Sequence, residues 1–370
     1  MKRLAVIFIF IFLFSFGVKA EESTTYEEQY KSSGIEEIKQ SIDKDTLNYL
    51  EQYGINPSDR NIADKLSTEN VFGHIWNFFK NGLARPLKCL ASILCIVLIT
   101  CLITAFSKTS YSFAPATFAG TLAASIIMTK DLWSAVNAAV SALKACSAFM
   151  LSFVPAFAGI VTLSGKAVTG AAAGAALLIA AQAVSNISSF FILPLMGGYL
   201  AISICSGISP FLSGTKTAET VKKIAVFVLS LVTTVFIGVI SIQTAVNSNA
   251  DTLSLKTAKF LLGSGVPIAG AALSEAAGTV YASMSLLKST VGIYGVAVVA
   301  AIMLPILCEL IIWRGVMLLS SALSDMFGNE KMSSLLRAVD MMLAVLAGVL
   351  LTVVFTFIIS LSTVVKAGGG

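Results

Sequence analysis

The residues of this chain that could do chemistry are few, and they do not form the patterns of known enzyme sites. The stretch from Gly159 to Lys166 is similar to a phosphate-binding loop. However, five residues instead of four separate its two glycines, and Ala167 stands where a serine or threonine would hold magnesium. The sequence has one histidine, His74, so neither a histidine-based catalytic triad nor a histidine-rich metal site can be built. We therefore expect no enzymatic activity, no metal and no cofactor.

The cysteines give no site either. All of them lie in apolar segments, and none lies in the acidic segment near the N-terminus: Cys89, Cys95, Cys101, Cys146, Cys205 and Cys308. The first three follow one another at six-residue steps, which place them on different faces of a helix. We expect neither a disulfide framework nor a zinc site.

Charged residues inside apolar segments are the stronger candidates, because a charge at membrane depth is costly and usually serves a function. Glu309 lies within the apolar segment 291–313 and is near enough along the chain to pair with Arg314. Glu275 and Lys259 lie in a second apolar region. The alternative is that the lysines extend to the membrane surface and that Glu309 is neutral or paired. Glu309, Glu275 and Lys259 are therefore candidates for a transport pathway.

The composition indicates which elements must position these residues. Of 370 residues, 56% are hydrophobic and 12% are charged, and the mean hydropathy is +0.87. A soluble domain of this size needs more polar surface than this, so most of the chain belongs in a membrane. The net charge of +5 is spread over single lysines and arginines and forms no basic face for nucleic acid.

The N-terminus indicates export. Lys2 and Arg3 precede an apolar run and a site of small residues at 18–20, which is typical of a signal peptide over residues 1–20. An uncleaved anchor is the alternative. Residues 21–67 follow as an acidic, water-exposed head, with eleven acidic and five basic residues between Glu21 and Lys65.

Helical spacing continues through the head and beyond it. Isoleucines and leucines recur at this spacing and predict short helices in the head: Ile35, Ile38, Ile42, Leu47 and Leu50. Residues 68–87 are predicted to form an amphipathic helix on the membrane surface, anchored by Trp76. The alternative is that this segment extends the first spanning helix at 88–111.

From residue 88 onward the sequence predicts an all-α polytopic membrane protein with about six to eight transmembrane helices. The clear spans are 88–106, 112–129, 187–208, 224–242, 291–313 and 341–364. The stretches 132–186 and 251–290 are broken by glycine, proline and lysine, which favours short or re-entrant helices. Gly170 and Gly174 form a small-residue step for close helix packing, either inside the protein or between copies of the chain in a homo-oligomer.

Several short sequences recur at a spacing of about 111 residues. Val154 and Pro155 recur as Val266 and Pro267, and the pair at 193–194 recurs at 304–305. We therefore predict two membrane repeats, 112–223 and 224–340, followed by a last transmembrane helix and tail at 341–370. Chance matching in a chain rich in alanine and leucine is the alternative. A repeat would place a pathway at its interface, near Pro155, Pro267 and Glu275.

The charges of the loops predict an orientation. If each broken stretch is a hairpin, the loops at 107–111, 209–223 and 325–340 share one side. That side carries six basic residues: Lys108, Lys216, Lys222, Lys223, Lys331 and Arg337. The loops of the other side carry three: Lys130, Lys256 and Lys259. This difference weakly favours a cytoplasmic position for the first side and an exported position for the head.

Residues 238–296 resemble the stage III sporulation protein AE family of endospore-forming bacteria. The most specific part is Thr257-Ala258-Lys259-Phe260, then Val266-Pro267, Glu275-Ala276, and Leu286-Leu287-Lys288 with Val291-Gly292. The signal peptide, the acidic head and the layout of spans are also similar, although the head matches only in character.

The resemblance implies a membrane component of the complex that joins the mother cell and the engulfed forespore. It implies a position in the mother-cell-derived outer forespore membrane, with the head in the intermembrane space. The implied partners are the other proteins of the same operon, including a secretion-type ATPase and ring-forming proteins, and through them a forespore-side partner. The role would be that of a channel, conduit or scaffold subunit. A stand-alone permease for a small solute is the alternative, and the exported head favours the first role.

Overall fold

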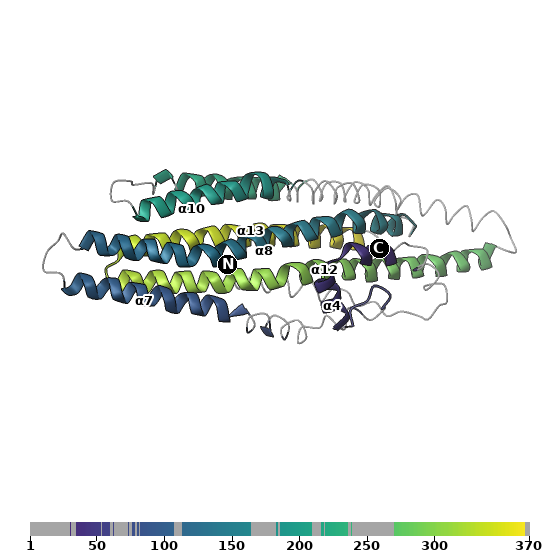
Figure 1. Ribbon diagram of the computed structural model, residues 1–370. Coiled ribbons are helices and arrows are strands. Elements are labelled where there is room, and N and C mark those ends of the chain that lie inside the picture. Colours follow the sequence, from purple (N-terminus) through teal and green to yellow (C-terminus); the bar gives the residue numbers. More distant parts are fainter. Residues whose placement is uncertain are drawn as a thin grey trace.

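The computed structural model of the chain is a bundle of long helices (Figure 1). It describes residues 35–52, 54–59, 76–77, 82–106, 113–163, 186–208, 216–217, 219–235 and 270–366, and six single positions: Tyr30, Ile62, Gly73, Lys80, Ala183 and Gly238. Every regular element within these residues is helical, so the predicted all-α class is confirmed. The signal peptide expected at 1–20 lies outside them.

The first two long helices are antiparallel neighbours. α7 spans Ala84–Phe106, and α8 spans Phe113–Leu163. α8 is about 75 Å long at 1.5 Å per residue. It continues through Lys130, Asp131 and Pro155, so the predicted end of a span at residue 129 and the predicted break at Pro155 are both wrong.

The position of Pro155 explains why α8 tolerates it. Proline cannot donate a hydrogen bond to the carbonyl four residues earlier, which here belongs to Leu151. Both residues lie on the exposed side of α8, away from the helices it packs against. Phe153 and Phe157 on the opposite side are buried in the core and hold the helix in place.

The next two long helices form a hairpin and pack along each other. α12 spans Gly270–Met326 and is about 85 Å long, and α13 spans Glu330–Lys366. The loop predicted at 325–340 is therefore mostly helix, and Arg337 lies within α13. From residue 270 onward, the stretch predicted to be broken at 251–290 is continuous helix; the rest of it lies outside the described residues.

Backbone hydrogen bonds close the turn between α12 and α13. The N–H of Asn329 donates to the carbonyl of Ser324 (2.9 Å), and the N–H of Gly328 donates to the carbonyl of Asp325 (3.0 Å). This is the Schellman arrangement, which requires a residue with positive φ, and Gly328 has a φ of 71°. Asn329 then caps α13, since its Oδ1 accepts the N–H of Met332 (3.3 Å).

Replacing Gly328 with alanine is expected to lower the free energy of unfolding by about 1 kcal/mol, because a Cβ strains the left-handed conformation. Gly328→Asn should cost less, since asparagine adopts this conformation more readily. Gly315→Ala, inside α12, is the matched control, because nothing lies within 4 Å of a Cβ built there. It should be neutral or slightly stabilising. The measurement is the midpoint of unfolding in mixed detergent–SDS micelles, and equal destabilisation by both alanines would contradict the prediction.

A shorter apolar pair covers α13. α10 spans Leu193–Ile208 and follows a π-helical turn, η2, at Ser188–Ile192. Residues 219–235 form a second helical segment. α10 contacts α13, and Leu200, Leu229 and Val232 pack against the hydrophobic core. Figure 1 shows this pair above α8 and α13.

The helices of the head pack against the bundle. α3 spans Ile35–Ile38, a 3-10 turn (η1) follows at Lys39–Ser41, and α4 spans Lys44–Gln52. Asp43 caps α4, since its carboxylate accepts hydrogen bonds from the N–H (3.0 Å) and the hydroxyl (2.8 Å) of Thr46. The short helices predicted for the head are therefore confirmed.

The apolar side of the head is not exposed to water. Ile35, Ile38 and Leu50 are each at most 2% exposed and share one hydrophobic core with the long helices. α3 contacts α8, and α4 contacts α12 (Figure 1). The described part of the head is thus built into the bundle and does not form a separate domain.

Phenylalanines fill the centre where α8, α12 and α13 meet. On α8, Phe149, Phe153 and Phe157 follow one another with ring centroids 5.1 and 5.4 Å apart. Phe357 of α13 lies 6.5 Å from the first ring and 5.9 Å from the second. Gly295 of α12 faces Phe153, and a Cβ at this glycine would lie 2.5 Å from the ring. Close aromatic packing therefore closes the seam between these three helices.

Four of the described helices are long and apolar enough to cross a membrane. They are Ala84–Ile103, Thr117–Thr162, Leu286–Met326 and Glu330–Ile358, with a shorter apolar helix at Phe190–Ser206. The sequence predicted six to eight crossings. The predicted spans 112–129 and 291–313 are parts of the longer helices α8 and α12, because a charged residue or a proline that lowers the hydropathy does not end a helix.

The structure describes both members of one pair of matched sites, and this pair does not support the predicted repeat. Leu193 and Pro194 begin α10 after a π-helical turn, whereas Leu304 and Pro305 lie in the interior of α12. Pro267 lies outside the described residues, so its match with Pro155 is not compared. The repeats and the pathway between them stay predictions.

Candidate functional site

An ion pair between α12 and α13 is the main polar contact inside the helical hairpin. The Nε of Arg314 donates to Oδ1 of Asp340 at 2.8 Å. The side chain of Asp340 is 9% exposed and that of Arg314 is 30% exposed. A charged hydrogen bond of this length is among the stronger side-chain contacts in proteins. The pair therefore fixes one helix against the other.

The pair lies deep within the two apolar helices. Arg314 is about 18 Å from the end of α12, and Asp340 is about 15 Å from the start of α13, at 1.5 Å per residue. A bilayer has a hydrocarbon core of about 30 Å, so these distances correspond to its middle. In such surroundings each charge would be costly alone, and the pairing offsets that cost.

A third element contributes to the surroundings of the ion pair. Tyr199 of α10 is 6% exposed, and the charges of Asp340 and Glu219 act on it electrostatically. Glu219 belongs to the helical segment 219–235. The ion pair is thus placed where the α12–α13 hairpin meets the shorter pair that covers it, so it can influence the packing of all these helices.

Small polar residues line the hairpin between the ion pair and the turn. The buried serines are Ser320, Ser321, Ser324 and Ser333. Ser324 and Ser321 donate their hydroxyls to the carbonyls of Ser320 and Leu318, both at 2.8 Å. Small residues let two helix backbones approach closely where lipid supplies no hydrophobic driving force. The serines therefore suit a tightly packed helix pair.

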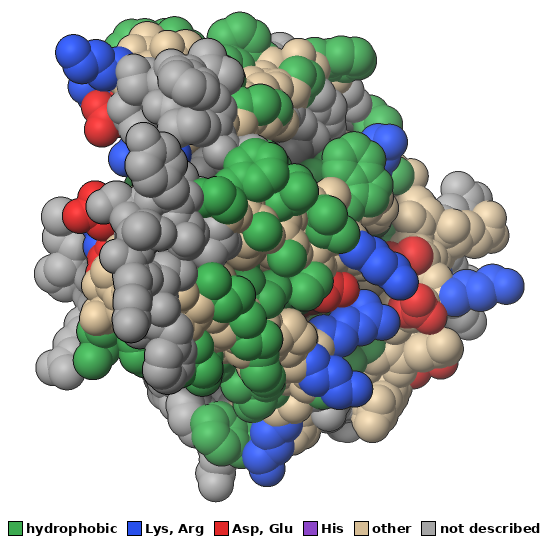
Figure 2. All heavy atoms as spheres, turned by 60° about the vertical axis from the view of Figure 1, so that its left-hand side comes forward, with side chains coloured by type: hydrophobic (Ala, Val, Ile, Leu, Met, Phe, Trp, Pro, Cys, Tyr) green, Lys and Arg blue, Asp and Glu red, His purple; other side chains and the backbone are tan. Residues whose placement is uncertain are grey.

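Basic side chains gather at the end of the bundle that carries the turn. Figure 1 places the facing ends of α7 and α8 and the α12–α13 turn at one end, and Figure 2 turns this end forward. Arg337 pairs with Asp325 across the turn. The other basic residues near these helix ends are Lys216, Lys222, Lys223 and Lys331. Figure 2 shows charged side chains close together beside a broad hydrophobic surface.

Two of the residues predicted to line a pathway have described side chains, and the structure does not bring them together. Pro155 lies exposed on the outer side of α8. Glu309 is half-buried in α12, and Arg314 pairs with Asp340 instead of with Glu309. Glu275 belongs to α12, but the structure does not describe its side chain. Lys259, Pro267, Gly170 and Gly174 also lie outside them.

Asp340 was missed because it stands one residue before the predicted span 341–364, where a carboxylate looks like part of a loop. The helix actually starts at Glu330, ten residues before Asp340. The signal that could have found it is the Gly-Asn pair at 328–329, which marks a helix end followed by a helix start. With the turn placed there, Asp340 falls inside α13.

Comparison with known proteins gives two matches. A family model described as "Stage III sporulation protein AE" matches residues 59–368. The chain is 26% identical over 316 residues to a protein of Bacillus subtilis (strain 168) with the same description, and the match covers 84% of this chain and 77% of that protein. No solved structure gives a significant match.

Proposed function

Because the chain belongs to the Stage III sporulation protein AE family, we propose that it is the polytopic membrane subunit of a complex that links the mother cell and the forespore. It would act there as a scaffold or conduit that forespore development requires after engulfment. The observation that carries the proposal is the family match over residues 59–368, which includes the long helices α7, α8, α12 and α13. The proposed role makes or breaks no bond.

The packing of the bundle supports a scaffold more than a pore within one chain. Phe149, Phe153, Phe157 and Phe357 occupy the seam between α8, α12 and α13, and each is at most 1% exposed. A hydrated pathway along this seam would have to displace them. If the complex conducts a solute, we propose that the pathway runs between copies of this chain or between the chain and a partner.

The proposed location and partners follow from the family resemblance. We place the protein in the mother-cell-derived outer forespore membrane, with its head in the intermembrane space. The proposed partners are the other stage III sporulation A-operon proteins, including a secretion-type ATPase and ring-forming proteins, and indirectly the forespore-side partner. Co-purification from sporulating cells tests these contacts.

A stand-alone permease for a small solute is the second candidate. The charged side chains at membrane depth favour it, since Arg314, Asp340 and the half-buried Glu309 lie within apolar helices. The ion pair also serves the packing of α12 against α13, so it does not require a transport role.

Deletion of the gene separates the two candidates. We expect normal growth, normal engulfment, and forespores that then collapse or stop developing, with spore yield restored by the wild-type gene in trans. Fluorescence microscopy of growing and sporulating cells provides the measurement. Unimpaired spores together with a growth defect tied to one solute would overturn the proposal and support the permease.

A further inference from the structure

The exposed surface of α8 changes character along the helix. Near its start the exposed side chains are large and apolar, as at Phe118 (45%), Leu122 (38%) and Ile126 (66%). After Trp133 the exposed side becomes polar or small: Ser134, Asn137, Ser141, Lys144, Ala148, Ser152 and Gly159. Leu151 (48%) and the exposed Pro155 are the exceptions. One continuous helix therefore presents two different surfaces to its surroundings.

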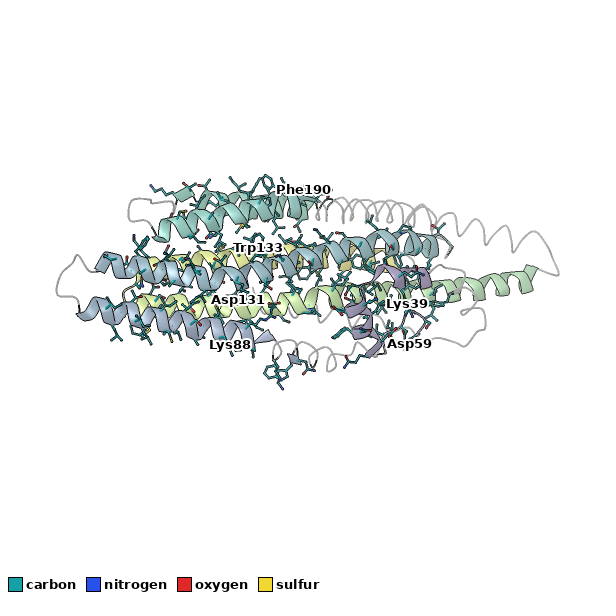
Figure 3. The ribbon with its side chains drawn as sticks, in the orientation of Figure 1. Lys39, Asp59, Lys88, Asp131, Trp133 and Phe190 are labelled. Atoms are coloured by element: carbon teal, nitrogen blue, oxygen red, sulfur yellow. The ribbon has the colours of Figure 1, made fainter. Side chains whose placement is uncertain are left out.

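Charged and indole side chains mark the level where the surface changes. Lys88 of α7 and Lys130 of α8 are exposed, and Asp131 is close enough to α7 to act electrostatically on Cys89. Figure 3 places Lys88, Asp131 and Trp133 near one level along the bundle. We call Lys88, Lys130, Asp131 and Trp133 the collar. Tryptophan and lysine are typical of the boundary between hydrocarbon and water.

The distance from the collar to the end with the turn matches the thickness of a bilayer. From Lys88 to Phe106 in α7, and from Phe113 to Lys130 in α8, the helices rise about 26 Å at 1.5 Å per residue. The hydrocarbon core of a bilayer is about 30 Å thick. α8 and α12 are about 75 and 85 Å long, so each continues far beyond this thickness.

The other helices show the same division. Between the collar and the turn they expose many large apolar side chains: Leu98, Ile99, Leu102 and Ile103 on α7, Ile311, Leu318 and Leu319 on α12, and Phe227, Leu231 and Val235 in 219–235. At the collar level and beyond it, the described residues expose fewer large apolar side chains: Leu83 and Leu87 next to Lys88, Phe190 and Phe191 before α10, and Leu151 and Leu351. The lipid-compatible surface thus covers one part of the bundle.

The acidic head packs on the other part. Tyr294 of α12 is 1% exposed, and Tyr30 and Glu51 of the head act on it electrostatically. Tyr294 lies about 48 Å from the end of α12, well beyond the collar. Figure 1 shows the head beside this section of α12. A polar head next to a polar face of α8 fits an aqueous environment.

From these observations we infer that the bilayer covers only the part of the bundle between the collar and the α12–α13 turn. The remaining part of α8, α12 and α13, with the head packed against it, stands in water. The protein is then a membrane anchor with a helical stalk. The inference rests on the exposed surfaces alone and does not depend on the proposed function.

Single cysteines on the exposed side of α8 test the inference. The background is a variant in which all six natural cysteines are replaced by alanine, purified and reconstituted into phosphatidylcholine–phosphatidylglycerol vesicles. Asn137→Cys, Ser141→Cys and Ser152→Cys should react with a charged, membrane-impermeant maleimide at least about tenfold faster than Leu122→Cys and Ile126→Cys, because a thiolate forms in water and not in hydrocarbon. The vesicles are opened by freezing and thawing during labelling, so both faces are accessible.

Labelling after unfolding in SDS and urea is the control, since all five cysteines should then react at similar rates. Protection of positions 137, 141 and 152 in vesicles, followed by reaction after unfolding, would overturn the inference. A second measurement needs no substitution. A lipid-soluble carbene reagent should modify the wild-type chain at 113–130 and spare 134–162, and equal modification of the two segments would also overturn it.

Discussion

Replacing Asp340 with alanine is expected to lower the free energy of unfolding by about 3 kcal/mol or more, because the substitution leaves the Arg314 guanidinium without its partner inside apolar helices. The pair is 2.8 Å long, and the Asp340 side chain is 9% exposed. Breaking a buried pair from one side usually costs more than removing both members. Arg314→Met should cost at least as much as Asp340→Ala, since it leaves the more buried member of the pair (9% exposed, against 30% for Arg314) without its partner.

The double variant Arg314→Met/Asp340→Leu is the matched control. It removes both charges at similar volume, so we expect a stability close to wild type and far above that of Asp340→Ala. Arg337→Met, which removes the exposed pair with Asp325, should change the stability by less than about 1 kcal/mol. The measurement is the SDS-unfolding midpoint in mixed micelles, together with spore yield. If the two single variants and the double variant are equally stable, the pair does not hold the hairpin together.

Gly295→Leu is expected to have the second large effect. A Cβ at Gly295 would lie 2.5 Å from Cζ of Phe153, and this ring is itself fixed by Phe149, Phe157 and Phe357. The added side chain must separate α12 from α8, which costs about 3 kcal/mol, at the upper end for overpacked cores. Gly295→Ala should cost about 1–2 kcal/mol for the same reason.

Removing part of the ring tests the cause of this effect. Phe153→Leu alone leaves a cavity and is expected to be destabilising. In the presence of Phe153→Leu, however, Gly295→Ala should cost less, with a coupling of about 1 kcal/mol, because the new Cβ enters the space left by the ring. Strictly additive effects would show that Gly295 and Phe153 do not contact each other in the folded protein.

The class of the fold was predictable because it depends on composition. A chain that is 56% hydrophobic and 12% charged must place most of its helices in lipid or against one another. The short helices of the head were also predictable, since Ile35, Ile38 and Leu50 follow helical spacing and are buried. These features need information only about neighbours along the sequence.

The lengths of the helices were not predictable from hydropathy. Lys130 and Asp131 lower the local hydropathy, and Pro155 suggests a break, yet α8 continues through all three. The reason is that a helix ends where its backbone groups find other partners, as at Gly328 and Asn329, and not where its side chains become polar. The charged residues around this turn continue into α13, so the sequence did not reveal that α12 ends at Met326 and that α13 begins at Glu330.

The candidate site was predictable only in part. The rule that charged residues at membrane depth are functional candidates selected the segment around Glu309 and Arg314. This segment of α12 does contain one member of the ion pair, Arg314. The partner of Arg314 is 26 residues away along the chain, on another helix. Such a pairing depends on the register of α12 against α13, and this register becomes known only when the turn at Gly328 is placed correctly.

The short α12–α13 turn has a consequence for how the protein enters a membrane. A turn of three residues, Phe327–Asn329, cannot leave one helix in the bilayer while the next waits in water on the far side. We therefore expect α12 and α13 to be inserted together, as one helical hairpin. Arg314 and Asp340 would then meet before either is transferred into hydrocarbon, so the translocation machinery would release a hairpin whose central charges are already neutralised by each other.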